Sequence, residues 1–335
     1  MPKKLIPFVQ SILVALAWVC ALPAAIGADW SPTQTLEFIV PAGPGGALDQ
    51  VGREVQQFFE KTQRSKFQMI VVNKGGGNGK IAFDALKQKT GDPHYLTINT
   101  TGYMSNYLIG NLDMLPHREL TPLAILQDEY LVLAVRADSP IKDLSEVLQK
   151  LKSDPTSLRI AVATSIGNHI HVGTAKALKA AGIDITKIVV VPFRSSSDSV
   201  LAMIGGHIEL VAATTPNVVS MVQAGKIRLL AVSAEKRLGG VFSNTPTWRE
   251  SGVDSDFHST LGILAPKGLS PEQIDYWGTF FKNLSTSKEW QSSMEKNQSH
   301  LHFVPFKDTT SYYEQEFLGV KEIVGDLKLL GSAKN

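Results

Sequence analysis

The residues that could do chemistry lie in loops, and they form no catalytic set. Ser165, His169 and His171 come closest to a nucleophile and a base, but no G-x-S-x-G elbow surrounds Ser165. The two histidines are two residues apart, without the i, i+4 spacing of a helical metal pair, and no acidic residue lies near them in sequence. We therefore expect no catalytic residue, no metal and no cofactor, and we expect one histidine to cap or pack at a helix start.

The first loop, Pro41 to Asp49, is suited to an anion. Its glycines let backbone N–H groups approach a ligand, and the helix that follows points its positive end at the same place. Neither G-x-G-x-x-G nor Gly-Lys-Ser/Thr is present, which argues against a dinucleotide or phosphate loop. Asp49 could accept from a ligand donor or from a neighbouring amide, and the alternative to anion binding is a tight turn.

Four further loops also follow strands. Asn73–Gly79 is either a second binding loop or a flexible connection. Thr164–His171 combines hydroxyls, an amide and helix N-terminal N–H groups, which suits a carboxylate. Arg194–Ser199 and Thr214–Pro216 form the last group, where the serines could simply cap a helix. Whether Arg194 contacts a ligand or a protein acid stays open.

The elements that position these loops alternate between strand and helix, which indicates βαβ units and parallel sheets. In such sheets ligands bind beyond the carboxyl ends of the strands, where these loops lie. Trp248, Trp277 and Trp290 fall in apolar patterns and are expected to pack in the core. Strands are expected at 36–40, 67–72, 95–100, 158–163, 187–193, 208–213 and 227–233, and helices at 51–59, 81–89, 171–181, 200–204 and 217–224.

Two apolar strands differ from the rest because each ends in a proline-containing turn. They cover about 130–136 and 260–266, and we expect them to be the hinge strands that cross between two lobes. The first lobe would then comprise residues 29–130 plus 264–335, and the second lobe residues 131–263.

The N-terminus has the pattern of a secretory signal peptide over residues 1–28. Lys3 and Lys4 precede an apolar stretch, which is short for a membrane-spanning helix of about 20 residues, and Ala25–Gly27 fits a cleavage site. Cleavage removes Cys20, the one cysteine, and leaves 31 basic and 31 acidic residues. We expect a periplasmic protein with no electrostatic reason to bind nucleic acid.

Taken in order, the motifs resemble the solute receptors of the tripartite tricarboxylate transporter family, often called Bug proteins. The family's first-loop signature, Pro-x-Pro-Pro-Gly-Gly-x-x-Asp, is similar to Pro41–Asp49 here. The other similar segments are Val71–Gly75, His171 with Gly182–Asp184, Gly205–Leu210, Ala224–Val232 and Thr245–Gly252. The sequence departs from the pattern at Gly43, at Gly75–Asn78, which predicts a looser turn, and at Phe193–Ser195.

The resemblance implies an α/β, two-lobed periplasmic-binding-protein fold, a type II-like Venus flytrap with a mixed, mostly parallel sheet in each lobe. It implies a monomeric receptor, not an enzyme, that binds a di- or tricarboxylate or aromatic carboxylate and delivers it to membrane transporter subunits. Two alternatives are an exported α/β hydrolase or lyase, and a binding protein that signals to a sensor kinase. The ligand-binding residues implied by position are Pro44, Gly45, Gly46, Asp49, Asn73, Ser165, Asn168, His171, Ser195, Ser196 and Thr214.

Overall fold

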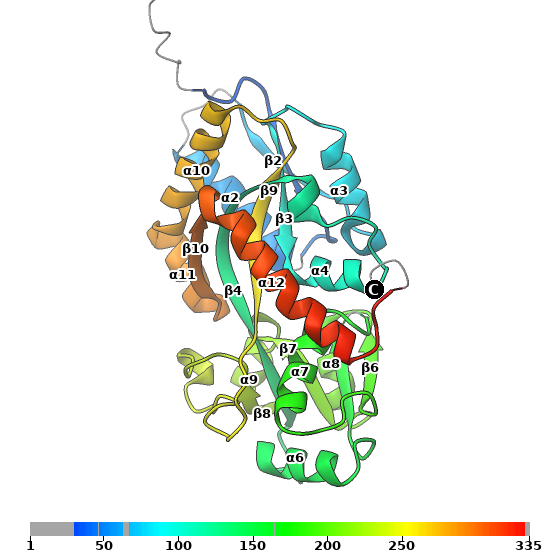
Figure 1. Cartoon of the computed structure of the whole chain (residues 1–335). Coiled ribbons are helices and arrows are strands. Elements are labelled where there is room, and N and C mark those ends of the chain that lie inside the picture. The colour runs from blue at the N-terminus through cyan, green and yellow to red at the C-terminus, as the bar shows by residue number, and fades with distance from the viewer. Residues whose placement is uncertain (1–29, 46, 63–66, 164, 332–335) are drawn as a thin grey trace, which may run out of the picture.

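The fold is an α/β arrangement built on one continuous, curled β-sheet (Figure 1). The computed structural model describes residues 30–45, 47–62, 67–163 and 165–331. The strands of the sheet follow the order β2-β1-β3-β9-β4-β7-β5-β6, and β10 and β8 both pair with β4. They are β1 (Leu36–Val40), β2 (Met69–Asn73), β3 (Tyr95–Thr100), β4 (Thr121–Arg136), β5 (Arg159–Ala163), β6 (Val189–Phe193), β7 (Leu210–Thr214), β8 (Ile227–Val232), β9 (His258–Ala265) and β10 (His300–Pro305).

Helices cover both faces of this sheet. The α-helices are α2 (Ala47–Thr62), α3 (Lys80–Lys87), α4 (Thr101–Leu108), α5 (Pro116–Glu119), α6 (Leu144–Ser153), α7 (His169–Ala180), α8 (Ser196–Ile204), α9 (Val219–Gln223), α10 (Pro271–Ser285), α11 (Lys288–Asn297) and α12 (Phe306–Asp326). Short 3-10 turns are η1 (Gly77–Gly79), η2 (Thr215–Asn217) and η3 (Gly240–Phe242). Within the described residues, no helix is both long and apolar enough to cross a membrane.

The long strand β4 connects the two lobes. From Thr121 to Tyr130 it pairs with β9, and it also pairs with β10 on this side. From Leu131 onward its partner is β7, and β8 joins from Val132. The first part therefore belongs to the upper lobe in Figure 1 and the second part to the lower lobe.

The sheet is mixed, but it is less parallel than the sequence indicated. The parallel ladders join β1 to β2 and β3, and β5 to β6 and β7. Every ladder of β4 and β9 is antiparallel. The physical reason is that the chain passes between the lobes along β4 and returns through β9, so strands running in opposite directions lie side by side in the centre.

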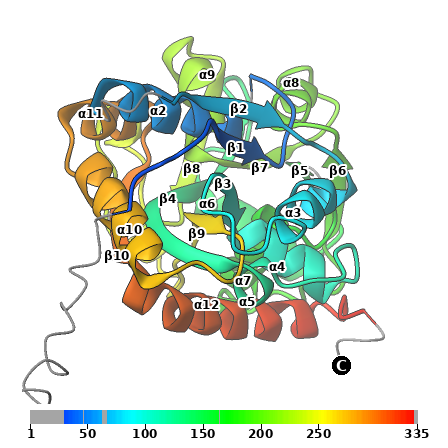
Figure 2. The same ribbon diagram turned by 90° about the horizontal axis from the view of Figure 1, so that it is seen from above.

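The core confirms the packing role expected for the three tryptophans, since Trp248, Trp277 and Trp290 are all buried. Trp277 and Trp290 pack between α10, α11 and the β1–β3 side of the sheet. A second cluster runs without interruption from α4 of the upper lobe into α7 of the lower lobe. Figure 2 shows α12 along this side of the molecule, and it packs against both α4 and α7.

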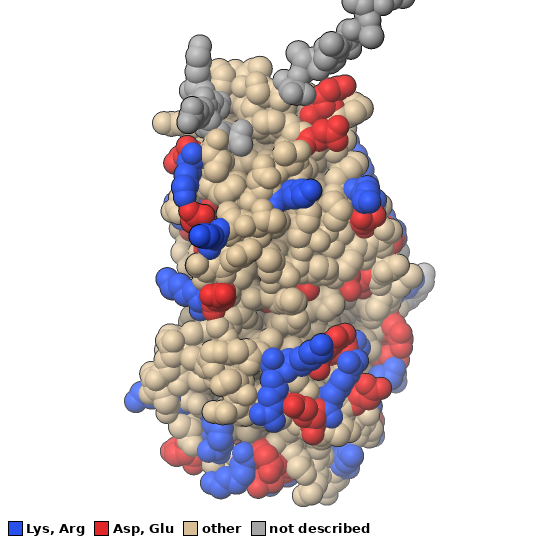
Figure 3. All heavy atoms as spheres, turned by 90° about the vertical axis from the view of Figure 1, so that its left-hand side faces the viewer, with Lys and Arg blue, Asp and Glu red and all other residues tan. Residues whose placement is uncertain are grey.

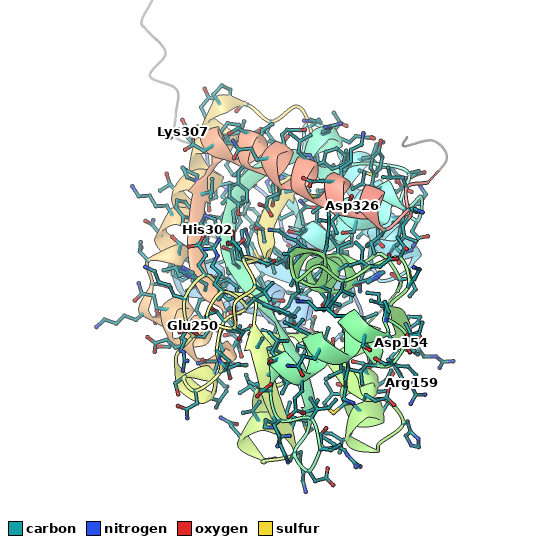
Figure 4. The ribbon with its side chains drawn as sticks, turned by 60° about the horizontal axis from the view of Figure 1, so that its bottom comes forward. Asp154, Arg159, Glu250, His302, Lys307 and Asp326 are labelled. Carbon is teal, nitrogen blue, oxygen red and sulfur yellow. The ribbon has the colours of Figure 1, made fainter. Side chains whose placement is uncertain are left out.

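Polar contacts also join the two lobes. Lys179 of α7 pairs with Asp326 near the end of α12, and Asp326 is labelled in Figure 4. On the opposite side, Thr215 Oγ1 donates to the backbone oxygen of Gln298 at 3.0 Å. Figure 3 shows a face on which the surface narrows between the lobes and side chains of both charges lie mixed. The lobes therefore contact each other on two sides of the crossing strands.

Candidate ligand-binding site

Asp49 holds the first loop in place. It lies in the first turn of α2, is 3% exposed, and accepts from three donors. The backbone N–H of Gly45 and the Nε of Arg53 reach Oδ2 at 2.9 and 2.8 Å, and Asn73 Nδ2 reaches Oδ1 at 2.9 Å. Asn73 Nδ2 also lies 3.2 Å from the carbonyl oxygen of Ala42, so the end of β2 is tied to the same loop.

The charge of Asp49 is stabilised by this arrangement. Its hydrogen bond with Arg53 is the largest cause that lowers its pKa, to about 2, although burial opposes the shift. Of the two roles predicted for Asp49, the structure shows acceptance from a neighbouring amide, that of Gly45. Pro44 and Gly45 are exposed at the tip of the loop, and Gly46 lies outside the described residues.

The second loop, for which the sequence predicted a looser turn, has a left-handed backbone over four consecutive residues. Gly76, Gly77, Asn78 and Gly79 all have positive φ angles, and Gly77–Gly79 forms a 3-10 turn. A Cβ at Gly79 would lie 2.6 Å from the ring of Tyr103, so only glycine fits there. The glycines that replace the family's usual residues thus close a left-handed turn against α4.

The N-terminus of α7 brings Asn168 and His171 together. The Asn168 side chain caps the helix by accepting from His171 N–H at 3.0 Å, and its Nδ2 donates to the carbonyl of Ala163. The Gly167 N–H donates to His171 Nδ1 at 2.9 Å. Burial lowers the pKa of His171 to about 4, so the ring is neutral near pH 7. Because Nδ1 is an acceptor, the proton of the neutral ring is on Nε2.

Ser165 is a partly buried residue beside this helix end. Its Oγ is buried and has no hydrogen-bond partner among the described residues. A buried hydroxyl without a partner is unusual in a folded protein, because losing its hydrogen bonds to water costs about 1–3 kcal/mol. Ser165 Oγ, which has no partner among the described residues, and the Nε2–H of His171 are therefore two donors at the positive end of one helix.

The loops at α8 and β7 are arranged differently. Ser195 caps α8 by accepting from Asp198 N–H at 3.1 Å, as the capping interpretation predicted. Ser196 is partly buried, and Arg194 is exposed. Thr214 is buried at the end of β7 and accepts from Asn217 Nδ2 at 2.7 Å. Of these residues, Thr214 lies nearest the crossing, since it pairs with Leu131 of β4.

Two features near the strand ends could not be predicted from the sequence. The first is the junction of β3 and α4, where a Cβ at Gly102 would lie 2.8 Å from Nδ1 of His169 in the other lobe. The rule that ligands lie beyond strand ends would have pointed to Thr100 and Thr101, because a strand was expected at 95–100. The second is Glu129, which precedes the predicted hinge strand and gave no signal of its own.

Two cavities of the described chain lie away from these loops. One of about 390 Å³ separates α2 from α11, and one of about 790 Å³ lies between β10, α11 and the segments 233–239 and 256–258. Neither is lined by a predicted site residue. No group of three or more metal-binding side chains occurs in the described residues. The candidate site comprises the strand-end loops before α2, α7 and α8 and after β2 and β7.

Comparison with known proteins places these features in a family. The model of the tripartite tricarboxylate transporter family receptors matches residues 52–329. A UPF0065 protein in the gbd 5′ region of Cupriavidus necator is 26% identical over 312 residues, 93% of this chain and 93% of its own. BugT of Bordetella pertussis is 26% identical over 270 residues, 79% of this chain and 80% of its own.

Solved structures show the same fold. A protein of R. palustris with adipate has a TM-score of 0.78 at 22% identity, covering 90% of this chain and 99% of its own. The periplasmic binding protein BugD has a TM-score of 0.76 at 20% identity, with 90% and 99% covered. MatC from Rhodopseudomonas palustris, with bound malate, has a TM-score of 0.74 at 20% identity, with 88% and 100% covered. The two-lobed binding-protein fold is thus confirmed, and because the family model covers most of the sequence, the chain belongs to the tripartite tricarboxylate transporter family receptors.

Proposed function

We propose that this chain is a periplasmic receptor that captures a small carboxylate between its lobes and delivers it to the membrane subunits of a tripartite transporter. The ligand is a di- or tricarboxylate or an aromatic carboxylate, and the receptor acts as a monomer without catalysing a reaction. The family match and the malate and adipate held by two structural relatives support this class of ligand.

The observation that carries the proposal is the start of α7. Ser165 Oγ is buried without a partner among the described residues, and His171 presents Nε2–H as a neutral donor. The first N–H groups of a helix have no intrahelical acceptor, and the helix dipole adds positive potential there. A ligand carboxylate supplies the acceptors that these groups need.

The first loop would supply the opposing contacts. Its tip at Pro44 and Gly45 is exposed, and Asp49 and Asn73 fix it from behind. A ligand stabilises the shut arrangement of two lobes only if it touches both of them. We therefore assign the backbone of the first loop to one end of the ligand, and we assign Ser165 and His171 to the other end.

The lobe boundaries are also part of the proposal. We place lobe 1 at 29–130 plus the C-terminal part and lobe 2 from 131, and the change of partners along β4 at this point supports that. Because β9 pairs with β4 from His258 onward and with β3 from Leu261 onward, the return crossing fits better just before 258 than at 264. The proposed signal peptide, residues 1–28, lies outside the described residues.

A thermal-shift screen of the mature chain tests the proposal, with malate, adipate, citrate, benzoate and amino acids as probes. A bound acid raises the melting temperature by mass action. At a ligand concentration of one hundred times Kd, binding adds about 2.7 kcal/mol to the free energy of unfolding. Ser165→Ala should weaken the best acid about tenfold, the worth of one charge-assisted hydrogen bond. Its unliganded stability should not fall, since the hydroxyl has no partner to lose among the described residues.

Ser157→Ala is the matched control, because Ser157 is exposed and lies away from the strand-end loops. It should leave both affinity and stability unchanged. If no acid shifts the melting temperature, the receptor proposal fails. If an acid is consumed during the incubation, the hydrolase or lyase alternative replaces it.

A further inference from the structure

Two adjacent acids on β4 face opposite sides of the crossing. Asp128 and Tyr130 line the 790 Å³ cavity, but Glu129, between them, does not. Successive side chains of a strand point to opposite faces, so Glu129 faces away from that cavity. The hydroxyl of Thr214, at the end of β7 in the other lobe, lies near enough to Glu129 to lower its pKa.

The two acids differ in how their charge is satisfied. Asp128 pairs with His302 Nδ1 at 2.7 Å and accepts from Thr260 Oγ1 at 3.1 Å, and His302 is labelled on β10 in Figure 4. Glu129 has no ion pair with any described residue, and Thr214 is the one side chain that acts to lower its pKa. Burial raises the pKa of Glu129 to about 7, because its charged form is poorly solvated.

The surroundings of Glu129 are the strand ends that face the site. Thr214 accepts from Asn217, so its own proton is free to donate to Glu129. The ladder partner of Glu129 is Ser259 on β9, and the next residue, Thr260, donates its N–H to Thr101 Oγ1 at the start of α4. Glu129 is thus placed between the carboxyl ends of β3 and β7, one in each lobe.

We propose that Glu129 determines ligand specificity by accepting a hydrogen bond from the ligand, so that the receptor prefers carboxylates that carry a hydroxyl or ammonium donor. This inference rests on the proposed receptor function and narrows its ligand class. A poorly solvated carboxylate is stabilised most by a hydrogen-bond donor, and a second carboxylate placed beside it is repelled. Only an acid with a donor near its carboxylate satisfies both Glu129 and the anion-binding groups at α7.

Three four-carbon acids isolate this effect. Succinate, malate and aspartate share one skeleton and differ at C2, which carries hydrogen, hydroxyl or ammonium. The five-carbon series glutarate, 2-hydroxyglutarate and glutamate repeats the comparison at a second length. In calorimetric titrations of the mature protein, at least one donor-bearing acid should bind ten times more tightly than its unsubstituted analogue.

Glu129→Gln should reduce that preference to threefold or less, because its amide is a weaker and uncharged acceptor. Glu235→Gln is the matched control: it removes the same charge from the side of the crossing that lines the 790 Å³ cavity, and it should keep the full preference. Loss of aspartate binding alone identifies ammonium as the donor, and loss of malate binding alone identifies hydroxyl. Thermal unfolding should show Glu129→Gln at least as stable as the wild type, since the variant replaces an acid whose charged form is poorly solvated.

Two results overturn the inference while leaving the receptor proposal intact. One is an unsubstituted acid that binds the wild type as tightly as its hydroxy and amino analogues. The other is a preference that Glu129→Gln leaves unchanged. If no acid of either series, and none of the wider screen, binds the wild type, the receptor proposal and this inference fall together.

Discussion

Asparagine at position 49 would keep the size of the aspartate but lose its capacity to accept on both oxygens. All three partners of Asp49 are donors: Gly45 N–H, Arg53 Nε and Asn73 Nδ2. Whichever way the amide of Asp49→Asn is turned, its NH₂ group faces at least one of these donors. The variant therefore loses an ion pair and sets two donors against each other at a site that is 3% exposed.

The size of the effect follows from the pKa of Asp49, which is lowered from 3.8 to about 2. By linkage, an acid whose pKa is lowered this far on folding contributes about 2 kcal/mol of stability at neutral pH. This value is discounted slightly because Arg53 is half exposed. This contribution is complete above the pKa that Asp49 has in the unfolded chain, and it is lost as the pH falls through the pKa that Asp49 has in the folded protein. About half of it should have gone at pH 3.

Urea unfolding of the wild type and of Asp49→Asn at pH 7, 5, 4 and 3 measures the difference. Asp308→Asn is the control, because Asp308 is exposed in the first turn of α12 and should change stability by less than about 0.5 kcal/mol. A difference between wild type and Asp49→Asn that is near zero at pH 7, or that does not shrink toward pH 3, would refute the idea that Asp49 anchors the first loop by its charge.

The remaining predictions concern the lobe contact and the crossing. Gly102→Ala should lower the free energy of unfolding by about 1 kcal/mol, because its Cβ would meet His169 at 2.8 Å. Gly319→Ala, at an open position of α12, is the control and should raise the free energy of unfolding by up to about 1 kcal/mol. Equal effects of the two substitutions would contradict the contact between Gly102 and His169. The hydrogen bond with Asp128 raises the pKa of His302, so an NMR titration should place it above that of a free histidine, and Asp128→Asn should lower it. The stability from this pair should be complete below about pH 6.5 and lost as the pH rises through the raised pKa, and a flat profile would count against it.

The sequence was most informative where local pattern and tertiary structure agree. The strands predicted at 36–40, 95–100 and 227–233 lie within a residue of β1, β3 and β8, because apolar runs bounded by turn residues leave little choice. The C-terminal part was not predicted, although Ser270 and Gln273 form a capping box that marks the start of α10. The pairing of β10 with β4 joins residues more than 170 positions apart, which no local pattern encodes.

The candidate site shows the same division. Glycine-rich loops at helix starts could be recognised from sequence, because their chemistry is local. The role of Asp49 could not be decided, because one of the three contacts that fix it comes from Asn73 on the neighbouring strand. Glu129 gave no signal at all, since its position beside Thr214 arises only when β4 crosses between lobes and pairs with β7.

The central claim, that this chain binds a small carboxylate between its lobes without transforming it, is tested most directly by one calorimetric titration. The mature protein is titrated with the best acid from the screen, and the acid is then recovered and examined by NMR. We predict saturable binding of one acid per chain, recovery of the acid unchanged, and an affinity that Ser165→Ala weakens about tenfold. Absence of heat with every acid, binding that Ser165→Ala leaves unaltered, or recovery of a chemically altered acid would contradict the account.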